Sequence, residues 1–493
     1  MRLGDLPDSV LSAVLSEACS GGHYDRATEL GRNLPLLAVC RRWRRVALPV
    51  VYSGVFVRYG ECRCRRPCTQ AEAVVEDPGC ATISTNLGLV ASAGYAGAAG
   101  WADIRVRCRV SPLAALRDII QQLRSIASKW DGVRSLEIVL SPESPPPAPP
   151  PDQADCGGDI EQLADALYTL MPRVRELVLG GAGGGGTPPV GALYGRLAAL
   201  CAGRLQVLDS TCPVAVPDSV EFGRLRDVDT SCRLPCMRPD ALETLALQDV
   251  PAHSSWWDAF STNTRSRTIR FPRLRSLRLA YSADPSSEDD DDDDNSGVAT
   301  RRRGPQRLCF PALDELHIRG GRGACRLLEQ AELPQRVGAV FVSAAAEVLR
   351  SLADAGVAAT RSVDLAIVEG AGSSDPAAVF ASVNRILSRA RGCRTLALYV
   401  YDSGLPVLPE SIGCAALTEL RVLAPTSIDT AVGLIQGLPR LAAMALHCVT
   451  PDSARLDLSV VVPETPGGGA PVAPLNAGLA SLALTFDGCR RSP

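Results

Sequence analysis

Lysine is almost absent from this sequence, in which Lys129 is the only one among 493 residues. Arginine therefore carries nearly all of the positive charge, and 51 basic side chains are opposed by 54 acidic ones, for a formal net charge of −3. A chain with this balance has no overall attraction for a phosphate backbone. We therefore expect no nucleic-acid partner.

The motifs of common enzyme chemistries are also missing. No glycine loop precedes Lys129, so the sequence has no phosphate-binding loop of the G-x-x-x-x-G-K-[ST] type. None of the four histidines belongs to a metal-binding or nucleophile motif such as H-E-x-x-H or G-x-S-x-G. These histidines are His23, His253, His317 and His447. We expect a protein that is not an enzyme and has no cofactor.

Long hydrophobic runs are a third absence. No window approaches the ~20 apolar residues that cross a membrane, and the first residues lack the basic and apolar segments of a secretion signal. We therefore expect a protein of the cytoplasm, the nucleus or both, whose 18 cysteines stay reduced and which has no membrane partner. The cluster of Cys62, Cys64, Cys68 and Cys80 lacks the paired C-x(2–4)-C spacing typical of zinc, which favours a linker without metal.

What the sequence does contain is an internal repeat, L-x-x-L-x-L, in which Val, Ile or Met replaces some leucines. Its last four residues alternate between apolar and other side chains, which is the period of a short strand with one buried face. Clear copies begin at Val133, Val174, Leu242, Leu274, Leu313, Val337, Cys393, Leu417, Leu441 and Leu479, weaker ones at Leu205, Leu225 and Thr360, and an opening strand is predicted from Trp101.

Segments with apolar residues at helical spacing lie between several copies. The predicted helices are Pro112–Trp130, Asp159–Met171, Ala344–Gly356, Asp375–Ala390 and Ser427–Leu438. Strands and helices that cannot bury their apolar faces alone must stack on the next copy, which predicts an α/β fold. The repeat resembles the leucine-rich repeat, whose period is ~20–29 residues. The resemblance implies a solenoid with a curved parallel sheet over residues 101–488, irregular because the usual Asn or Cys ladder is missing.

The N-terminal stretch combines a Leu-Pro pair, an apolar helical face and the sequence LLAVCRRWRRVA. The arginines around Trp43 fall outside the apolar face of their segment, so we expect them to form a solvated rim. Together these features resemble the F-box signature L-x-x-V-C-[KR]-x-W-[KR]. The resemblance implies a three-helix module over residues 1–58 that docks on the Skp adaptor of a cullin ubiquitin ligase. The positions that match the family's module core or adaptor interface are Leu6, Pro7, Val10, Leu11, Leu37, Val39, Cys40 and Trp43.

Composition divides the rest of the chain. Residues 59–100, with many Cys, Ala and Gly, are predicted to be a linker, and disordered insertions are predicted near 141–158 and 283–306. A G-x-G-x-x-G run from Gly181 to Gly186 follows a predicted strand, so a nucleotide-dependent enzyme is one alternative. We favour a plain loop, because Pro188 and Pro189 separate these glycines from the next helix.

Outward positions of the predicted strands carry the side chains that a partner on the concave face would meet. The candidates are Arg278, Glu315, His317, Arg319, Tyr399, Glu419, Arg421 and His447, although for each residue taken alone an ordinary solvated surface position is the favoured interpretation. We expect a non-catalytic substrate receptor, whose N-terminal helices hold a Skp-type adaptor and whose repeats hold an unknown target protein. The alternative is a leucine-rich-repeat scaffold without ligase association.

Overall fold

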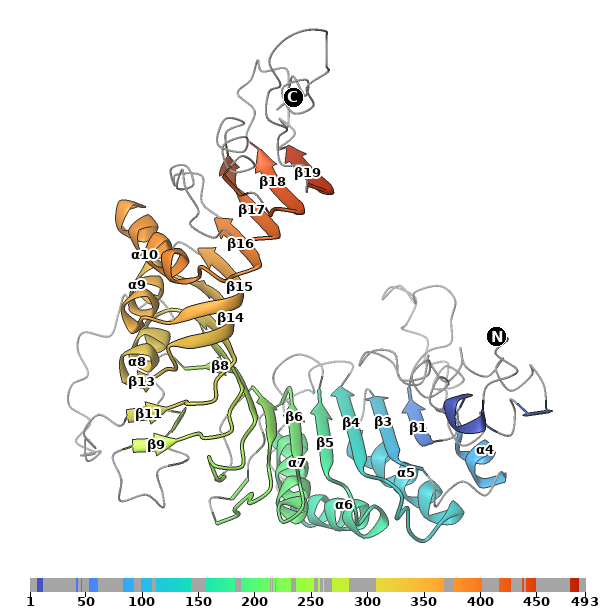
Figure 1. Cartoon of the computed structure of the whole chain (residues 1–493). Coiled ribbons are helices and arrows are strands. Elements are labelled where there is room, and N and C mark those ends of the chain that lie inside the picture. The colour runs from blue at the N-terminus through green and yellow to red at the C-terminus, as the bar shows by residue number, and fades with distance from the viewer. Residues whose placement is uncertain are drawn as a thin grey trace, which may run out of the picture. The chain divides into compact units, whose positions relative to one another are not determined.

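A computed structural model of the chain describes residues 7–11, 41–42, 46, 53–60, 83–92, 99–108, 112–142, 157–181, 188–212, 214, 216–217, 219–231, 236–251, 256–257, 260, 268–282, 307–367, 376–400, 416–426, 437–438, 440–448 and 479–486 (Figure 1). These residues belong to two compact units, Met1–Arg238 and Pro239–Pro493. Both units combine helices with a parallel sheet, so the α/β class that the repeat predicts is confirmed.

The sheet of the first unit starts with an antiparallel pair and continues in parallel. Strand β1 (Gly54–Tyr59) pairs antiparallel with β2 (Ile83–Thr85) and parallel with β3 (Trp101–Cys108). The strands then follow chain order through β4 (Ser135–Pro142), β5 (Glu176–Gly180), β6 (Val207–Ser210) and β7 (Asp227–Thr230). This unit also contains helices α4 (Leu87–Ser92), α5 (Pro112–Ile126), α6 (Gly157–Leu170) and α7 (Pro188–Cys201).

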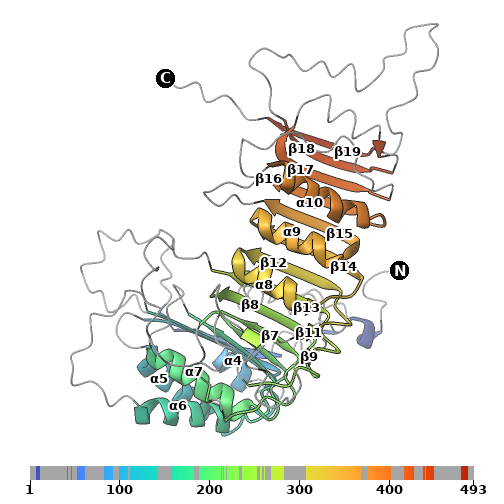
Figure 2. The same cartoon turned by 90° about the vertical axis from the view of Figure 1, so that its left-hand side faces the viewer.

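The second unit has a long parallel sheet whose neighbours are again successive in the chain. Its strands are β8 (Thr244–Val250), β10 (Ser276–Tyr281), β12 (Glu315–Gly320), β14 (Arg336–Ala344), β15 (Ala358–Ile367), β16 (Thr395–Val400), β17 (Glu419–Thr426), β18 (Ala443–Cys448) and β19 (Ser481–Phe486). A smaller parallel sheet joins β9 (Thr268–Arg270), β11 (Arg307–Cys309) and β13 (Ala331–Glu332). Helices α8 (Arg322–Gln330), α9 (Ala346–Ala355) and α10 (Pro376–Arg389) lie side by side along one face of the long sheet (Figure 2).

The repeated leucines set the register of the second unit. Equivalent apolar residues of neighbouring strands are paired and point into the core, where each is at most 2% exposed. This row contains Leu245, Leu277, Leu316, Val340, Val363, Leu396, Leu420 and Met444. Burying one such side chain stabilises the fold by about 1.5–3 kcal/mol. A register shift by one residue would turn the whole row to solvent, so the repeat fixes the pairing.

The strands predicted from the repeat are confirmed, including β6, β7 and β15, which correspond to the weaker copies. Four of the five predicted helices are confirmed with small shifts at their ends. One shift has a clear cause: α5 ends at Ile126 instead of Trp130, because the Trp130 backbone N–H bonds the Leu170 carbonyl at 2.7 Å and its ring is fully buried. Most of Ser427–Leu438 lies outside the described residues.

Helix α8, the small sheet and the start of α7 were not predicted correctly. Helix α8 and the small sheet were missed because they are short: α8 has nine residues, and its buried Ala324, Leu327 and Leu328 span little more than one helical turn. Pro188 and Pro189 begin α7 instead of separating it from the glycine run, since the first turn of a helix needs no N–H from proline. Residues 182–187 of that run lie outside the described residues.

The proposed domain boundaries are not tested by the two-unit division. The segment 59–100, expected to be a linker, contains β2 and α4, and β1 lies within the range expected for the helical module. The two expected insertions lie outside the described residues, except that β4 extends to Pro142 and α6 begins at Gly157. The cysteine cluster at 62–80 also lies outside them.

One helix residue joins two strands of the first unit. The fully buried Tyr194 of α7 accepts a hydrogen bond from the Leu140 backbone N–H at 3.2 Å. Its hydroxyl donates to the Gly180 carbonyl at 2.8 Å. The Ile138 carbonyl oxygen lies 3.2 Å from the same hydroxyl. The hydroxyl therefore connects the ends of β4 and β5 to the helix that covers them.

We predict that Tyr194→Phe lowers the free energy of unfolding of the first unit by about 1–3 kcal/mol, because the buried Leu140 N–H loses its acceptor. Chemical denaturation of the full chain, followed by circular dichroism, measures the change. The matched control is Tyr168→Phe in α6, a half-buried ring under the Arg204 guanidinium, where the loss should be below about 0.5 kcal/mol. Equal midpoints for the Tyr194 variant and the parent would contradict the role of the hydroxyl.

Candidate functional site

The face of the second sheet opposite the leucines carries other side chains in rows. Parallel strands in register place equivalent repeat positions side by side, about 4.8 Å apart. One row contains Ser276, Glu315, Ala339, Ser362, Thr395 and Glu419. The next contains Arg278, His317, Phe341, Asp364, Ala397 and Arg421. Most of the candidate target-binding residues belong to these rows.

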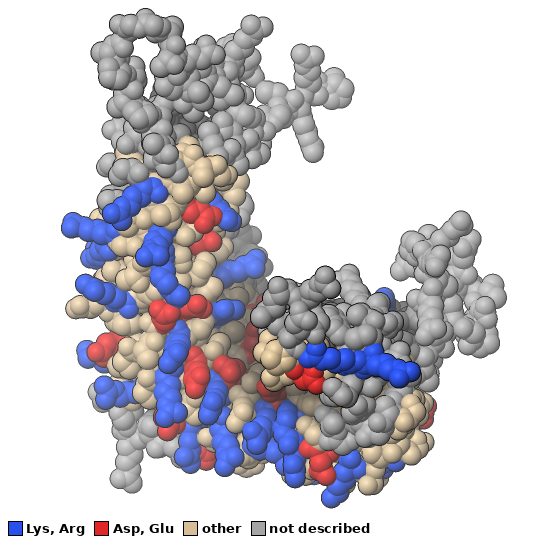
Figure 3. Space-filling view, turned by 45° about the vertical axis from the view of Figure 1, so that its right-hand side comes forward, with Lys and Arg blue, Asp and Glu red and all other residues tan. Residues whose placement is uncertain are grey.

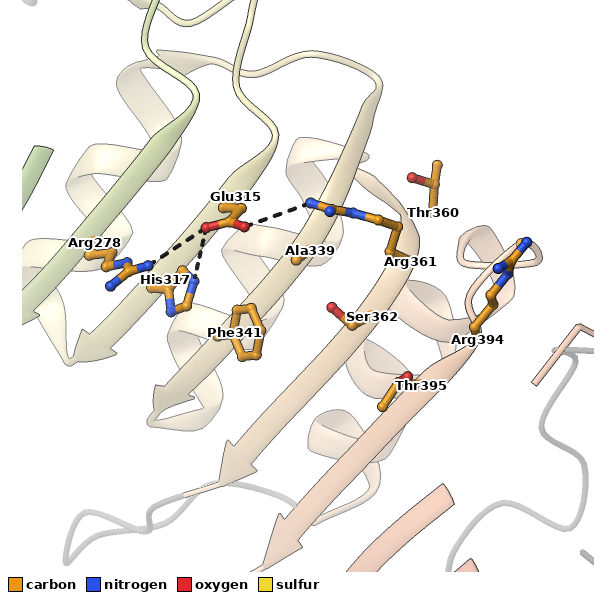
Figure 4. A pocket seen from close by; sticks show the side chains of 11 residues that line it. Arg278, Glu315, His317, Ala339, Phe341, Thr360, Arg361, Ser362, Arg394 and Thr395 are labelled. Carbon is orange, nitrogen blue, oxygen red and sulfur yellow. Dashed lines mark ion pairs between the residues drawn. The ribbon is translucent and has the colours of Figure 1, made fainter. Parts of the chain in front are cut away.

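A groove of about 770 Å³ crosses this face at strands β10 to β16 (Figure 4). Small residues form its floor, and larger side chains stand around them. The lining residues are Arg278, Glu315, His317, Ala339, Phe341, Thr360, Arg361, Ser362, Gly392, Arg394 and Thr395. Ala339 and Ser362 are neighbours in one row, and their small side chains leave room beside the larger ones that line the groove.

Glu315 lies at the centre of the charged groups of the groove. Its carboxylate is 3.7 Å from Arg278 Nη2, 3.8 Å from Arg361 Nη2 and 4.0 Å from His317 Nε2 (Figure 4). Arg361 also contacts Asp314 at 2.6 Å. The arginine side chains are more than half exposed, so each pair contributes only about 0–1 kcal/mol. These contacts orient the arginines rather than stabilise the fold.

His317 and Phe341 form a flat aromatic pair beside this cluster. Their ring centroids are 4.0 Å apart and their planes are inclined by 21°. Burial lowers the pKa of His317 below its ordinary 6.5, and Arg278 lowers it further, while Glu315 opposes both. The imidazole is therefore neutral at neutral pH, and the pair offers an uncharged surface.

A second charged cluster lies on β16 and β17. Arg421 Nε and Nη2 donate to one oxygen of Glu419 at 2.8 and 2.6 Å. A hydrogen bond to Glu419 raises the pKa of the Arg421 guanidinium, and Tyr399 acts in the same direction. Burial raises the pKa of Asp364, and Arg421 opposes the shift. Leu423 of the same strand is 45% exposed and adds an apolar contact surface.

The structure therefore brings six of the eight candidate target-binding residues into two clusters: Arg278, Glu315 and His317 in one, and Tyr399, Glu419 and Arg421 in the other. Arg319 is exposed on β12 in the row beyond His317. His447 belongs to β18, but its side chain lies outside the description.

Sequence reasoning missed Phe341, Asp364, Arg361 and Arg394. For Phe341 and Asp364 the sequence did contain a signal, because aligning the repeat copies places both residues at the position of His317. Arg361 lies within β15 and Arg394 directly precedes β16, each at the second position of its repeat copy, where the alternating pattern predicts no outward side chain.

At the N-terminus, residues 8–11 are helical, and the Leu11 backbone N–H bonds the Pro7 carbonyl at 2.9 Å. Leu11 is fully buried, whereas Val10 is 43% exposed. Arg42 Nε donates to Asp8 at 2.8 Å, so the two parts of the signature lie together. The other candidate adaptor-binding residues, Leu6, Leu37, Val39, Cys40 and Trp43, lie outside the described residues.

The comparisons with known proteins add no relative. No protein-family model matches the chain, and no curated protein matches it either. Within the described parts of the chain, no helix is long and apolar enough to cross a membrane, and no group of three His, Cys, Asp or Glu side chains could hold a metal ion. Basic and acidic side chains are interspersed over the visible described surface in Figure 3.

A buried acid lies on the strand face of the first unit. Asp103 is fully buried, and Arg105 donates to its Oδ1 at 3.0 Å and to Glu137 at 2.8 Å. Asp103 Oδ2 has no hydrogen-bond partner among the described residues. Burial, reinforced by Glu137, raises the pKa of Asp103 from 3.8 to about 6, although Arg105 opposes the shift.

We predict a pH dependence of stability from this acid. Because the folded state raises the pKa of Asp103, it binds the proton more tightly than the unfolded state, and the free energy of unfolding falls as the pH rises from about 4 to about 6. The full loss is about 3 kcal/mol. Asp103→Asn should remove this fall, as measured by urea denaturation between pH 4 and 8.

The control for this experiment is Asp118→Asn, which changes an exposed carboxylate of α5 and should keep the pH dependence of the parent. An Asp103→Asn variant whose stability follows the parent at every pH would show that Asp103 does not titrate in this range.

Proposed function

We propose that this protein is a non-catalytic substrate-recognition subunit of a Skp–cullin–F-box ubiquitin ligase of the cytoplasm, the nucleus or both. In this proposal the strands and helices form an irregular leucine-rich-repeat solenoid with a curved sheet, and the N-terminal residues form a three-helix F-box module. The module holds a Skp-type adaptor, and the strand face of the second unit holds a target protein.

The observation that carries the proposal is the face with ordered rows of charged and aromatic side chains. Nine successive strands from β8 to β19 span about 38 Å at the usual strand spacing. That width is sufficient for a standard protein interface of about 800 Å² per partner. Arg278, Glu315, His317 and Phe341 occupy neighbouring strands, so one target segment could contact all of them.

The adaptor half of the proposal depends on the F-box resemblance and on three described features: the burial of Leu11, the exposure of Val10 and one ion pair. Leu11 faces the interior and supports the first helical turn, while Val10 presents an apolar side chain to solvent. The ion pair between Asp8 and Arg42 holds the second part of the signature beside the first. With adaptor and target bound to one chain, the protein would act by raising the effective concentration of the target near the conjugating enzyme.

We predict that the purified chain binds a Skp-type adaptor and that Val10→Arg weakens this binding at least tenfold, because it places a charge in an apolar interface. Binding is measured by co-purification and by titration calorimetry. Val10 is exposed, so the variant should keep the circular dichroism spectrum and melting temperature of the parent.

The matched control is Leu423→Arg, which changes the other large apolar side chain with similar exposure, 45%, and lies on β17. It should leave adaptor binding unchanged. A well-folded parent that binds no adaptor would refute the ligase proposal and leave the alternative, a leucine-rich-repeat interaction scaffold without ligase association.

A further inference from the structure

Arginines gather where the parallel strands of the first unit begin, at the edge of the sheet opposite the arrowheads in Figure 1. Before β5 the chain reads Arg173–Arg175 around a central Val174, and before β7 it reads Arg224–Arg226 around a central Leu225. Both central residues are core residues, each 1% exposed. The arginine on either side of each is exposed. Burial of the repeated apolar residue thus presents two guanidinium groups to solvent in front of each of these strands.

Backbone hydrogen bonds place these positions side by side across the strands. The Arg175 N–H bonds the Arg134 carbonyl at 2.7 Å, so the residue before β5 adjoins the residue before β4. The Gln206 N–H bonds the Arg175 carbonyl at 2.7 Å, and the Arg226 N–H bonds the Gln206 carbonyl at 2.8 Å. Arg175 and Arg226 are therefore two strands apart, about 10 Å at the usual strand spacing.

Every charged residue at these positions of the first unit is an arginine. The positions are occupied by Gly132 and Arg134 before β4, Arg173 and Arg175 before β5, Arg204 and Gln206 before β6, and Arg224 and Arg226 before β7. We call these six arginines the arginine edge. Gathered cations repel one another when no carboxylate lies between them. An acidic partner would relieve this repulsion.

The arginine edge lacks counter-charges among the described residues. Arg173, Arg175, Arg224 and Arg226 form no ion pair with any of them. Arg134 donates to the uncharged Asp131 carbonyl at 2.6 Å, and the Arg204 guanidinium lies 4.5 Å from the centre of the Tyr168 ring. These two contacts orient guanidinium groups without neutralising them. The edge can therefore accept carboxylates from outside the described structure.

The corresponding positions of the second unit differ in one respect. Arg273 and Arg275 stand around a buried leucine before β10 and are exposed, as in the first unit. Acidic residues flank them, however, because the Arg275 N–H bonds the Glu243 carbonyl and the Asp314 N–H bonds the Arg275 carbonyl, each at 2.8 Å. An acidic ligand would meet like charges on both sides of this pair. The charge pattern therefore distinguishes the first unit.

The surroundings of the arginine edge favour a narrow acidic protein segment over a nucleic acid. The adjoining strand face carries the carboxylates of Glu137, Glu176, Asp209, Asp227 and Asp229. A long polyanion that spread onto this face would be repelled, since charges act over about 8 Å at physiological salt. None of the residues at the edge positions is aromatic, so the edge offers no ring on which a base could stack.

The length of the edge sets the size of this segment. From β4 to β7 it crosses three strand spacings, about 14 Å. An extended peptide advances about 3.3 Å per residue, so about five residues cover the edge. From these features we propose that the arginine edge binds an extended run of Asp and Glu residues of this length in a partner protein. The surface lies outside the strand face to which the proposed function assigns the target, and the inference does not depend on that assignment.

The test uses the full chain and an end-blocked, fluorescein-labelled peptide, Gly-Ser-Glu-Asp-Glu-Asp-Glu-Asp-Ser-Gly, followed by fluorescence anisotropy at physiological ionic strength. We expect saturable binding that weakens at least tenfold when Gln and Asn replace the acidic residues of the peptide. A double variant, Arg224→Ala with Arg226→Ala, should weaken binding of the acidic peptide at least fivefold. Because both side chains are exposed, this variant should keep the circular dichroism spectrum and melting temperature of the parent.

The matched control is Arg273→Ala with Arg275→Ala, which removes the same two charges from the same local sequence pattern in the second unit. It should change binding less than twofold. A loss as large as that of the Arg224 and Arg226 variant would overturn the proposal, because the peptide would then respond to net charge alone. Absence of binding by the folded parent, or equal binding of the uncharged peptide, would also overturn it.

Two further results would assign the edge to a different occupant and so refute the proposal. One is tighter binding of a thymidine oligonucleotide with six phosphates than of the acidic peptide, lost in the Arg224 and Arg226 variant, which would indicate a nucleic acid. The other is a rise of at least tenfold in peptide affinity when Glu288–Asp294 are replaced by serines, because the acidic run of the chain itself would then be the occupant.

Failure of this inference is distinguishable from failure of the proposed function. A chain that binds the adaptor but not the peptide would retain the ligase proposal and refute the role of the arginine edge. A chain that binds the peptide with the expected variant pattern but no adaptor would retain the arginine edge and refute the ligase proposal.

Discussion

The burial of one apolar side chain per strand at the same repeat position is the constraint on which the rest of this structure depends. Leu277, Leu316 and Val340 lie next to one another because a shift of one residue in the pairing would turn a whole row of such side chains to solvent. Since side chains alternate along a strand, fixing the inner row also fixes the outer rows. The positions of His317 and Phe341 on the strand face are thus a consequence of core packing.

This coupling explains why the candidate site could be partly predicted. The repeat pattern identifies strands and outward positions, and six of the eight expected target-binding residues do lie in two clusters. The groove itself was not predictable, because it depends on the small size of Ala339 and Ser362 relative to the other lining side chains. A pattern that records only apolar and polar positions contains no information on such differences in volume.

Other features depend on contacts between segments distant in sequence. Trp130 lies beyond the end of α5, because its backbone N–H bonds the Leu170 carbonyl at the end of α6 while its buried indole N–H donates back to the Leu123 carbonyl of α5. The apolar residues within Pro112–Trp130 keep helical spacing with or without that tryptophan. Only the tertiary contact therefore determines where α5 ends. Val10 and Leu11 show that helical spacing alone does not predict burial. Both fit one apolar helical face, yet Val10 is 43% exposed and Leu11 is fully buried.

The ion pairs of the strand face suit transient binding better than structural support. In the second unit, the pairs that Arg278, Arg361 and Arg421 form each involve an arginine more than half exposed, so water screens the attraction and the net contribution to stability is small. Such arginines can exchange an internal carboxylate for an external one at little cost to the fold, since the leucine rows below remain buried. In the function proposed above, a receptor that must release its target after modification requires contacts of moderate strength, and a sheet that presents weakly paired charges is suited to provide them.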